Sequence, residues 1–228
     1  MNLKEKKLKK IKKQILGCRK CTLYKKRKQP VVGSGDLNAK IMFIAEAPGY
    51  WEDVKGEPFV GRAGKILDEL LASVKIKREG VFVANILKCR PPENRSPKKE
   101  EIKACTPYLL KQIEIIKPKV IATLGNFSTA FIFSTFDGSL VALRRHSDGA
   151  SATFSRPSQP KLLQRSRHES GKKYGLEKKL KGISKIHGQI FRKDKTTIIP
   201  FFHPAVAVYN NKMKKILKKD FQILKNFF

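Results

Sequence analysis

Four short apolar runs of strand length recur along the chain. They span residues 41–45, 81–85, 119–125 and 196–202. Continuous apolar runs of this length are typical of strands buried on both faces of a parallel sheet. The pattern therefore predicts four buried strands.

Apolar residues at helical spacing lie between and around these runs. They mark residues 66–74 after the first strand, 102–116 after the second, and 213–228 at the end of the chain. Pro107 is expected at a kink or at an early helix position. Residues 2–16 form a further amphipathic pattern rich in lysine. Alternating strands and helices predict an α/β fold with a parallel sheet covered on both faces.

Each predicted strand ends in a polar residue or a turn. Glu46, Asn85, Asn126 and His203 stand at or just beyond the four carboxyl ends. In open parallel sheets, ligands bind in the crevice outside these ends. We therefore expect the four residues to gather on one rim.

The chain of 228 residues is long enough for one domain with a full hydrophobic core. We expect a single domain over residues 1–228, interrupted at about 134–171. That segment contains five arginines but one lysine, together with many Ser, Gln and Pro residues. Its composition favours a flexible insertion, with a DNA-tracking arm as the alternative.

The charge balance points to a polyanionic partner. The formal net charge is +31, from 50 Lys and Arg against 19 Asp and Glu. Nucleic acid, an anionic membrane surface and acidic proteins all fit this charge. No apolar run reaches the roughly 18 residues of a membrane span, and the N-terminus lacks the pattern of a secretion signal. We therefore expect an intracellular, cytoplasmic protein whose thiols are reduced.

The four cysteines have the spacing of metal ligands. Cys18 and Cys21 form a C-x-x-C motif, and Cys89 and Cys105 follow after a long gap. In a reducing compartment this pattern predicts four ligands of one metal centre, with unrelated buried cysteines as the alternative. Spacing alone does not separate zinc from an iron-sulfur cluster, because four thiolates suit either.

Several spaced motifs together resemble a known enzyme family. They are Cys18-x2-Cys21, "AEAPGYWED" at 45–53, "GEPFVGRAG" at 56–64, "NILKCRPPENRSP" at 85–97, Cys105 and "HPAVA" at 203–207. In this order they resemble the iron-sulfur uracil-DNA glycosylases of family four, over residues 15–133 and 172–228. The resemblance implies a three-layer α/β/α sandwich around a central, mostly parallel four-stranded sheet. It also implies a 4Fe-4S cluster on the four cysteines, with zinc as the alternative.

The activity implied by the resemblance is hydrolysis of the N-glycosidic bond between uracil and deoxyribose in DNA, the opening step of base excision repair. Such an enzyme extrudes the base into a pocket. The Ala47, Pro48 and Gly49 turn leaves room for a ligand there. Phe59 is expected to stack on uracil, and the amide of Asn85 suits O4 and N3–H of uracil but not cytosine. A core Phe and a turn Asn are the alternatives.

Three residues are expected to act in the reaction. His203 would donate a hydrogen bond to O2 of the departing uracil, where negative charge develops; a structural His before Pro204 is the alternative. Glu46 and Glu52 would stabilise the sugar cation or orient the attacking water. Ion pairs with lysines are the alternative for both. Some related families place an Asp where this chain has Ala47, so the identity of the base stays open.

DNA contacts are expected from two loops. Arg90, Asn94 and Arg95 belong to the Pro-rich loop and suit the phosphates around the flipped nucleotide, although a solvated basic loop has the same composition. Val208 and Tyr209 lie in the run after His203 that is predicted to enter the space left by the base. Packing of a first helical turn is the alternative.

The sequence therefore predicts a monofunctional DNA glycosylase that uses water as its nucleophile, because no lysine stands out as a Schiff-base former. Its expected partner is uracil-containing DNA, and we expect a DNA-associated monomer; the sequence identifies no sliding clamp or downstream repair enzyme. Two other functions fit the same motifs. One is a non-catalytic zinc or iron-sulfur nucleic-acid-binding protein, and the other is a glycosylase for another damaged base.

Overall fold

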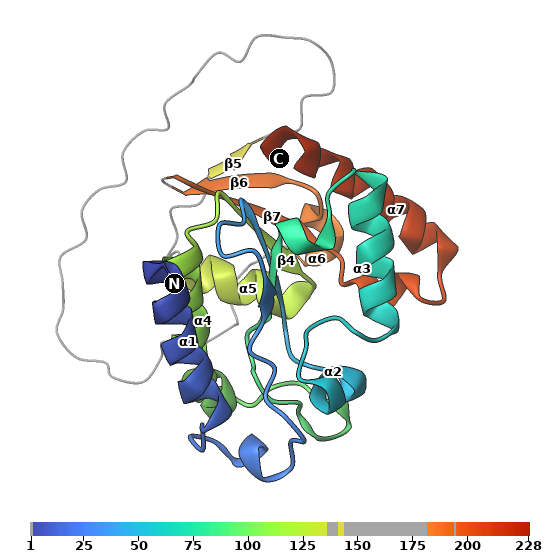
Figure 1. Ribbon diagram of the computed structural model, residues 1–228. Helices are drawn as coiled ribbons and strands as arrows, with labels where there is room; N and C mark the ends of the chain where they lie inside the picture. Colours follow the sequence, from blue (N-terminus) through green and yellow to red (C-terminus); the bar gives the residue numbers. More distant parts are fainter. Residues whose placement is uncertain (1, 136–140, 144–181, 194) are drawn as a thin grey trace, which may run out of the picture.

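The computed structural model describes residues 2–135, 141–143, 182–193 and 195–228. Most of the predicted insertion, residues 136–140 and 144–171, lies outside the described residues. A seven-stranded sheet forms the centre, with the strand order β1-β3-β2-β4-β7-β6-β5 (Figure 1).

The four predicted strands form the middle of this sheet. They are β2 (Ile41–Ala45), β3 (Phe82–Asn85), β4 (Val120–Leu124) and β7 (Thr196–Phe201), and they run parallel in the order β3-β2-β4-β7. The four predicted strands and their parallel arrangement are confirmed, but the sheet contains more strands than the four that were predicted.

Three strands that the hydrophobic pattern did not predict extend the sheet. On one edge, β1 (Ser34–Gly35) pairs antiparallel with β3. On the other edge, β6 (Ile190–Lys193) pairs antiparallel with β7, and β5 (Val141–Leu143) with β6. These strands have two to four residues, too few to give a periodic signal. The sheet is therefore mixed at its edges, and one of these strands falls within the predicted insertion.

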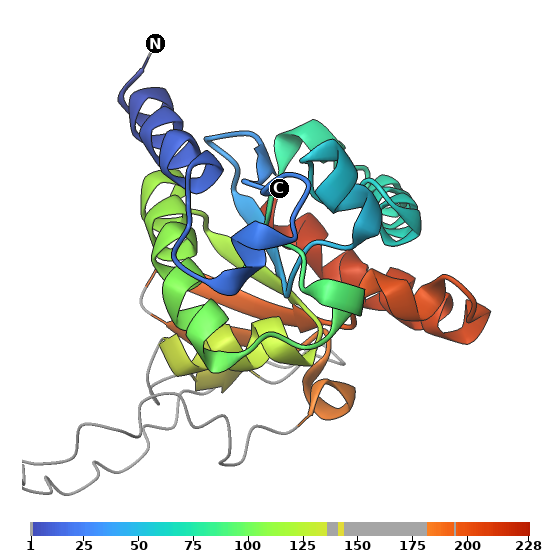
Figure 2. The ribbon, with the colours of Figure 1, turned by 90° about the horizontal axis from the view of Figure 1, so that it is seen from below.

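Helices cover both faces of the sheet, as predicted. One face carries α1 (Leu3–Leu16), α4 (Lys99–Ile116), α5 (Asn126–Thr135) and α6 (Ile183–Ile186). The other carries α3 (Arg62–Ser73) and α7 (Asn211–Phe221). Seen from below, the sheet lies between the two helical layers (Figure 2). The three-layer α/β/α sandwich is confirmed.

Side chains along β2 alternate between two hydrophobic clusters, one on each face of the sheet. Met42 and Ile44 belong to the cluster under α1 and α4, whereas Ile41, Phe43 and Ala45 belong to the cluster under α3 and α7. All five side chains are fully buried. A strand with no exposed face reads as a continuous apolar run, which is why it was visible in the sequence.

Short elements connect these layers. Helix α2 (Tyr50–Lys55) follows β2. The described residues also contain five 3-10 turns: Thr22–Lys25, Arg78–Gly80, Pro92–Asn94, Pro204–Ala207 and Gln222–Phe227. Helix α4 continues through Pro107. Within the described residues, no helix has both the length and the apolar character needed to cross a bilayer.

Candidate active site

A cavity of about 380 Å³ opens at the carboxyl ends of the parallel strands. It is lined by Glu46, Ala47, Pro48, Gly49, Glu52, Phe59, Ala63, Asn85, Pro91, Asn94, Arg95, His203 and Ala205. The register of the strands explains why Glu46 and Asn85 line the same cavity. Ala45 pairs with Asn85, so the residue after β2 lies beside the end of β3. Three of the four predicted rim residues line this cavity.

The fourth rim residue, Asn126, has a different place. Its Oδ1 accepts a hydrogen bond of 2.8 Å from the backbone N–H of Ile183, which joins α5 to the start of α6. The preceding Gly125 has a positive φ of 94°, and a Cβ there would lie 3.4 Å from the Cβ of His203. The end of β4 therefore supports the cavity from outside.

Asn85 contributes an unpaired acceptor to the cavity. The residue ends β3 and is 2% exposed, and its Oδ1 has no hydrogen-bond partner among the described residues. Buried polar atoms in native proteins are nearly always hydrogen-bonded. Because Asn85 also lines the cavity, its amide oxygen is available to a donor on a ligand.

His203 presents a neutral ring. Its Nδ1 accepts a hydrogen bond of 3.2 Å from the backbone N–H of Ala205, so the proton of the neutral imidazole belongs on Nε2. Burial lowers the pKa of His203 to about 4, against a smaller opposing effect of Glu52. His203 lines the cavity. At neutral pH the side chain is thus an uncharged donor at Nε2.

Phe59 packs against this histidine. The ring centroids are 5.7 Å apart and the planes are inclined by 29°. Phe59 holds a φ of 58°, which is costly for a residue with a side chain. Gly64 secures this conformation, because a Cβ at that position would lie 1.8 Å from the carbonyl oxygen of Phe59. The first turn of α3 therefore fixes the aromatic ring at the cavity.

Glu52 and Asp53, both in α2, have structural partners. Oε1 of Glu52 accepts hydrogen bonds from the N–H groups of Val60 (3.0 Å) and Gly61 (2.9 Å), and Oε2 accepts one from Gly49 (3.1 Å). Asp53 is buried and accepts from the backbone N–H of Lys28. Glu52 thus ties the turn after β2 to the start of α3, through backbone amides instead of lysine side chains.

Glu46 differs from these two carboxylates. It is half-buried and lines the cavity, and no hydrogen bond or ion pair joins its carboxylate to the described part of the chain. Burial raises its pKa. Of the two predicted catalytic carboxylates, Glu46 is the one whose oxygens remain available to a ligand or a water molecule.

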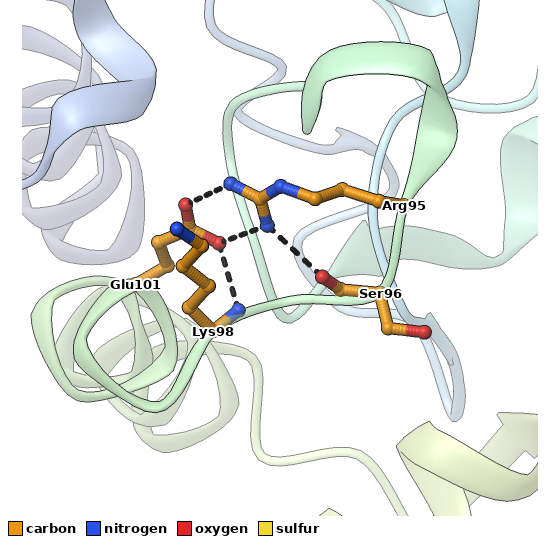
Figure 3. Close-up of polar contacts among 4 residues, drawn as sticks. All are labelled: Arg95, Ser96, Lys98 and Glu101. Carbon is orange, nitrogen blue, oxygen red and sulfur yellow. Dashed lines mark hydrogen bonds and ion pairs between the residues drawn. The ribbon is translucent and has the colours of Figure 1, made fainter.

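The Pro-rich loop is anchored by an ion pair. Arg95 donates to both carboxylate oxygens of Glu101, at 2.6 and 3.0 Å, and to the carbonyl oxygen of Ser96 (Figure 3). Glu101 also accepts from the backbone N–H of Lys98, which closes the first turn of α4. The hydrogen bond from Arg95 lowers the pKa of Glu101. The guanidinium predicted to grip phosphate is therefore engaged with α4, although its residue lines the cavity.

Of the other residues predicted to contact DNA, some pack within the protein and others remain accessible. Arg90 donates from Nε to Oδ1 of Asn94 at 2.8 Å. Tyr209 is 81% exposed, with the guanidinium carbon of Arg62 lying 5.1 Å from its ring centroid. Val208 packs against the core beneath α3 and α7, as in the alternative reading of this turn. Arg90 and Tyr209 remain open to a ligand.

The four cysteines surround one small space. Cys18 and Cys21 follow α1, Cys89 follows β3, and Cys105 lies in α4; all four are free thiols that line a cavity of about 10 Å³. Two hydrogen bonds of 3.1 Å reach their sulfurs, from Nη1 of Arg27 to Cys89 and from the N–H of Lys88 to Cys105. Burial raises the pKa of Cys105 to about 12.

This donor set suits a metal centre in chemistry and position. Nowhere in the described ranges, however, do three or more ligating side chains converge around one point. A tetrahedral zinc site needs sulfurs about 3.8 Å apart, given a zinc–sulfur distance of about 2.3 Å. A cluster whose iron atoms each bind one thiolate does not need the four sulfurs to converge on a single point.

Lys88 is a buried charged residue that the sequence analysis did not single out. It is 1% exposed, and its Nζ donates to the carbonyl oxygen of Asn85 (2.8 Å) and to Oε1 of Gln112 (2.7 Å). Burial lowers its pKa to about 8. The sequence did contain a signal for its burial: in "NILKCR" the lysine stands between an apolar strand and Cys89. Lys88 links the cysteine site to the base of the cavity.

At the carboxyl edge of the sheet the cavity thus combines an amide, an imidazole and an aromatic ring. This edge is where α/β enzymes with open parallel sheets place their ligand sites. Residues 32–225 match the family model of the uracil DNA glycosylase superfamily, and the chain belongs to this superfamily.

Relatives support this membership. The chain is 38% identical to the type-4 uracil-DNA glycosylase of Sulfurisphaera tokodaii over 94% of this chain and 82% of that protein. It is 38% identical to the type-4 uracil-DNA glycosylases of Archaeoglobus fulgidus (93% and 88% of the two chains) and Saccharolobus solfataricus (93% and 82%). The resemblance to family four inferred from the motifs is confirmed.

Proposed function

We propose that the protein is a uracil-DNA glycosylase that extrudes uracil from DNA and hydrolyses its N-glycosidic bond. The observation that carries the proposal is the buried Oδ1 of Asn85, which has no partner among the described residues, on a residue that lines the same cavity as Phe59 and His203. Membership of the superfamily supports the reaction class. The product is an abasic site, so the reaction is the opening step of base excision repair.

Recognition of uracil rests on hydrogen-bond polarity. N3–H of uracil donates to Oδ1 of Asn85, whereas N3 of cytosine is an acceptor and would face the amide oxygen without a proton between them. Leaving a buried acceptor unpaired costs about 1–3 kcal/mol. Phe59 supplies the stacking face, and the Ala47, Pro48 and Gly49 turn closes the pocket beside the ring. Cytosine is therefore rejected.

Bond cleavage places negative charge on the departing uracil. Nε2–H of His203 donates to O2 and stabilises this charge as it develops, and the ring is already in the donor form at neutral pH. The C1′–N1 bond breaks, the sugar acquires cationic character, and water forms the new bond to C1′. The freed uracil then takes up a proton.

Glu46 orients the attacking water and stabilises the sugar cation. Its available carboxylate and raised pKa support this role, and it takes the place of an acid in the turn, where this chain has Ala47. Glu52 acts as a positioning residue, because its three hydrogen bonds to backbone amides hold the turn and the loop of Phe59.

DNA approaches over a strongly basic surface. The net charge of +31 favours phosphate binding, and we expect contacts from Asn94 in the cavity, from Arg90, which is bonded to Asn94, and from the exposed Tyr209. We expect the protein to act inside the cell as a monomer on one DNA molecule. The insertion predicted at about 134–171 remains a prediction.

The cysteines are proposed to hold a 4Fe-4S cluster through Cys18, Cys21, Cys89 and Cys105. The resemblance to family four favours iron and sulfur over zinc. When bound, the cluster supplies a structural link and no redox step in the hydrolysis. The N–H donors of Arg27 and Lys88 suit thiolate sulfur. Purified protein should be brown with iron and sulfide in equal amounts; stoichiometric zinc in a colourless active protein would contradict the cluster.

The decisive experiment measures free uracil released from a single-stranded oligonucleotide with one uracil. We expect uracil and an intact abasic strand, with no borohydride-trapped covalent complex, because water is the nucleophile. Matched strands with cytosine, thymine or hypoxanthine in place of uracil are the controls. Tight DNA binding without release would support a non-catalytic binding protein, and preferential release of another base would assign a different substrate.

A further inference from the structure

An exposed aromatic pair borders the proposed base cavity. Tyr50 and Trp51 begin α2 directly after Gly49, which lines the cavity. Their side chains are 46% and 55% exposed, and their rings meet edge to face with centroids 5.2 Å apart. Large aromatic groups in contact with solvent are typical of interaction surfaces. Neither residue has a role in the pocket described above.

Cations surround this pair. Nζ of Lys28 and the guanidinium carbon of Arg90 each lie 5.2 Å from the ring centroid of Tyr50. Arg90 is in turn bonded to Asn94, which lines the cavity. A continuous surface therefore leads from the cavity mouth, through Arg90 and Tyr50, to Trp51.

Contacts with neighbouring residues hold the aromatic pair in place. The neighbouring Glu52 is fixed by three backbone amides, and one of these belongs to Gly61. A Cβ at Gly61 would lie 3.6 Å from Cδ1 of Trp51, so the indole packs close to the start of α3. Anchoring of this kind lowers the entropy that is lost when a ligand stacks on the ring.

We propose that Tyr50 and Trp51 form a stacking platform for an unpaired DNA base next to the extruded uracil in the same strand. The proposal rests on the proposed glycosylase function. Exposed aromatic rings beside basic side chains are how proteins bind single strands, because bases stack while cations contact phosphates. Extrusion of uracil removes a stacking partner from its neighbours, and the platform replaces it.

Trp51 is the member that receives the base. The ring of Tyr50 already has two cations against it, whereas the indole is the more exposed of the two. The cations also set the choice of partner, because an apolar protein surface would leave Lys28 and Arg90 without counter-charges. Phosphates on either side of a stacked base supply them.

The experiment uses the fact that Trp51 is the only tryptophan of the chain. Single-stranded DNA with a tetrahydrofuran abasic analogue at the uracil position binds without turnover. We expect this strand to quench the tryptophan fluorescence of the wild-type protein. A second strand, in which both nucleotides flanking the analogue are also abasic spacers, should leave the fluorescence nearly unchanged.

Affinities of variants give an independent measurement. Trp51→Ala should weaken binding to the first strand by roughly 5- to 150-fold, as expected for loss of one stacked base. On the spacer strand the same variant should bind like the wild type, and Trp51→Phe should keep most of the affinity on the first strand. Equal loss on both strands would mean that no base is stacked and would overturn the proposal.

Two further results separate the possible failures. Unchanged fluorescence of the wild-type protein on both strands would overturn the platform even if the variants fail to fold. If the wild type releases no uracil, the proposed function fails first. If it releases uracil while Trp51→Ala binds both strands normally, the platform alone is rejected.

Discussion

The base cavity and the cysteine site lie at opposite ends of one short segment, residues 85–89, and differ in what they leave open. The cavity measures about 380 Å³ and presents an acceptor without a partner. The space among the cysteines measures about 10 Å³, and two of its sulfurs already accept hydrogen bonds. The first site is formed by the packing of the sheet and loops alone. If the second holds the proposed cluster, we expect it to take its final shape only when the cluster binds, as metal sites coupled to folding do.

Lys88 connects the two sites. Its backbone N–H contacts Cys105, while its side chain supports the carbonyl of Asn85. We therefore expect changes at His203 and Glu46 in the cavity to alter the reaction with little effect on stability, whereas changes at the cysteines should act mainly on stability and metal content.

The largest effect is expected at His203. His203→Ala removes the donor to the departing uracil and should lower kcat by about 10²- to 10³-fold. Binding of an abasic-analogue strand and the melting temperature should change little. Single-turnover uracil release and anisotropy measure the two quantities. A variant that keeps the wild-type rate would remove His203 from the reaction.

The next largest effect on the rate of uracil release is expected at Glu46, and Glu52 is its matched control. Glu46→Gln should slow release by about 10²-fold without loss of stability. Glu52→Gln places an amide N–H₂ against backbone donors, so it should lower the melting temperature as well as the rate. Equal thermal stability and equal rate loss in both variants would contradict the separation of roles.

The pH dependence of the rate tests the roles assigned to Glu46 and His203. Glu46 must be ionised, and because burial raises its pKa, activity should fall as the pH drops through that raised value. In Glu46→Gln this limb should disappear. The remaining fall should come from protonation of His203 near pH 4, because the neutral ring is the favoured form above that pH. Rates of single-turnover release from pH 3.5 to 8 test both limbs.

Cys105→Ser tests the other side of the comparison. Removing one ligand should reduce iron and sulfide content and lower the melting temperature. The residual folded fraction should release uracil at a rate near that of the wild type, because no cysteine lines the base cavity. Metal analysis and calorimetry supply the measurements. Full metal content at wild-type stability would show that Cys105 is no ligand.

Lys88→Met breaks the link between the sites. It leaves the carbonyl of Asn85 and Oε1 of Gln112 buried without their donor, and each such group costs about 1–3 kcal/mol. The free energy of unfolding should fall, and KM should rise more than kcat falls as the position of Asn85 loosens. The double variant Lys88→Met with Gln112→Leu should recover part of the stability. No recovery would argue against the hydrogen-bonded pair as the cause.

The smallest effects separate the two arginines of the Pro-rich loop. Arg90→Ala should weaken DNA binding and reduce its salt dependence by about one counterion, without a change in melting temperature.

Arg95→Met should give a modest fall in melting temperature instead, because Arg95 holds Glu101 at the start of α4. Since the pKa of Glu101 is lowered in the fold, the stabilisation from this pair is present above the ordinary carboxyl range. It should be lost as the pH falls through the lowered value. The reverse pattern in the two variants would contradict these roles.

Much of this architecture was predictable, and the failures have physical reasons. The four parallel strands and α1, α3, α4 and α7 were visible because their burial is periodic or continuous. The edge strands and α2 were missed because two to six residues carry too little pattern. Helix α5 was missed because it follows β4 at once and is apolar on most sides.

The amino-acid sequence by itself determined the sheet core, the four polar strand ends and the cysteine set, because hydrophobic periodicity and residue chemistry are local properties. Tertiary structure alone decided that Glu52 and Arg95 are engaged in holding loops while Glu46 stays available. It also decided that Lys88 is buried between two sites. These outcomes depend on which backbone amides and carbonyls reach each side chain, and such long-range partners are set only when the layers pack.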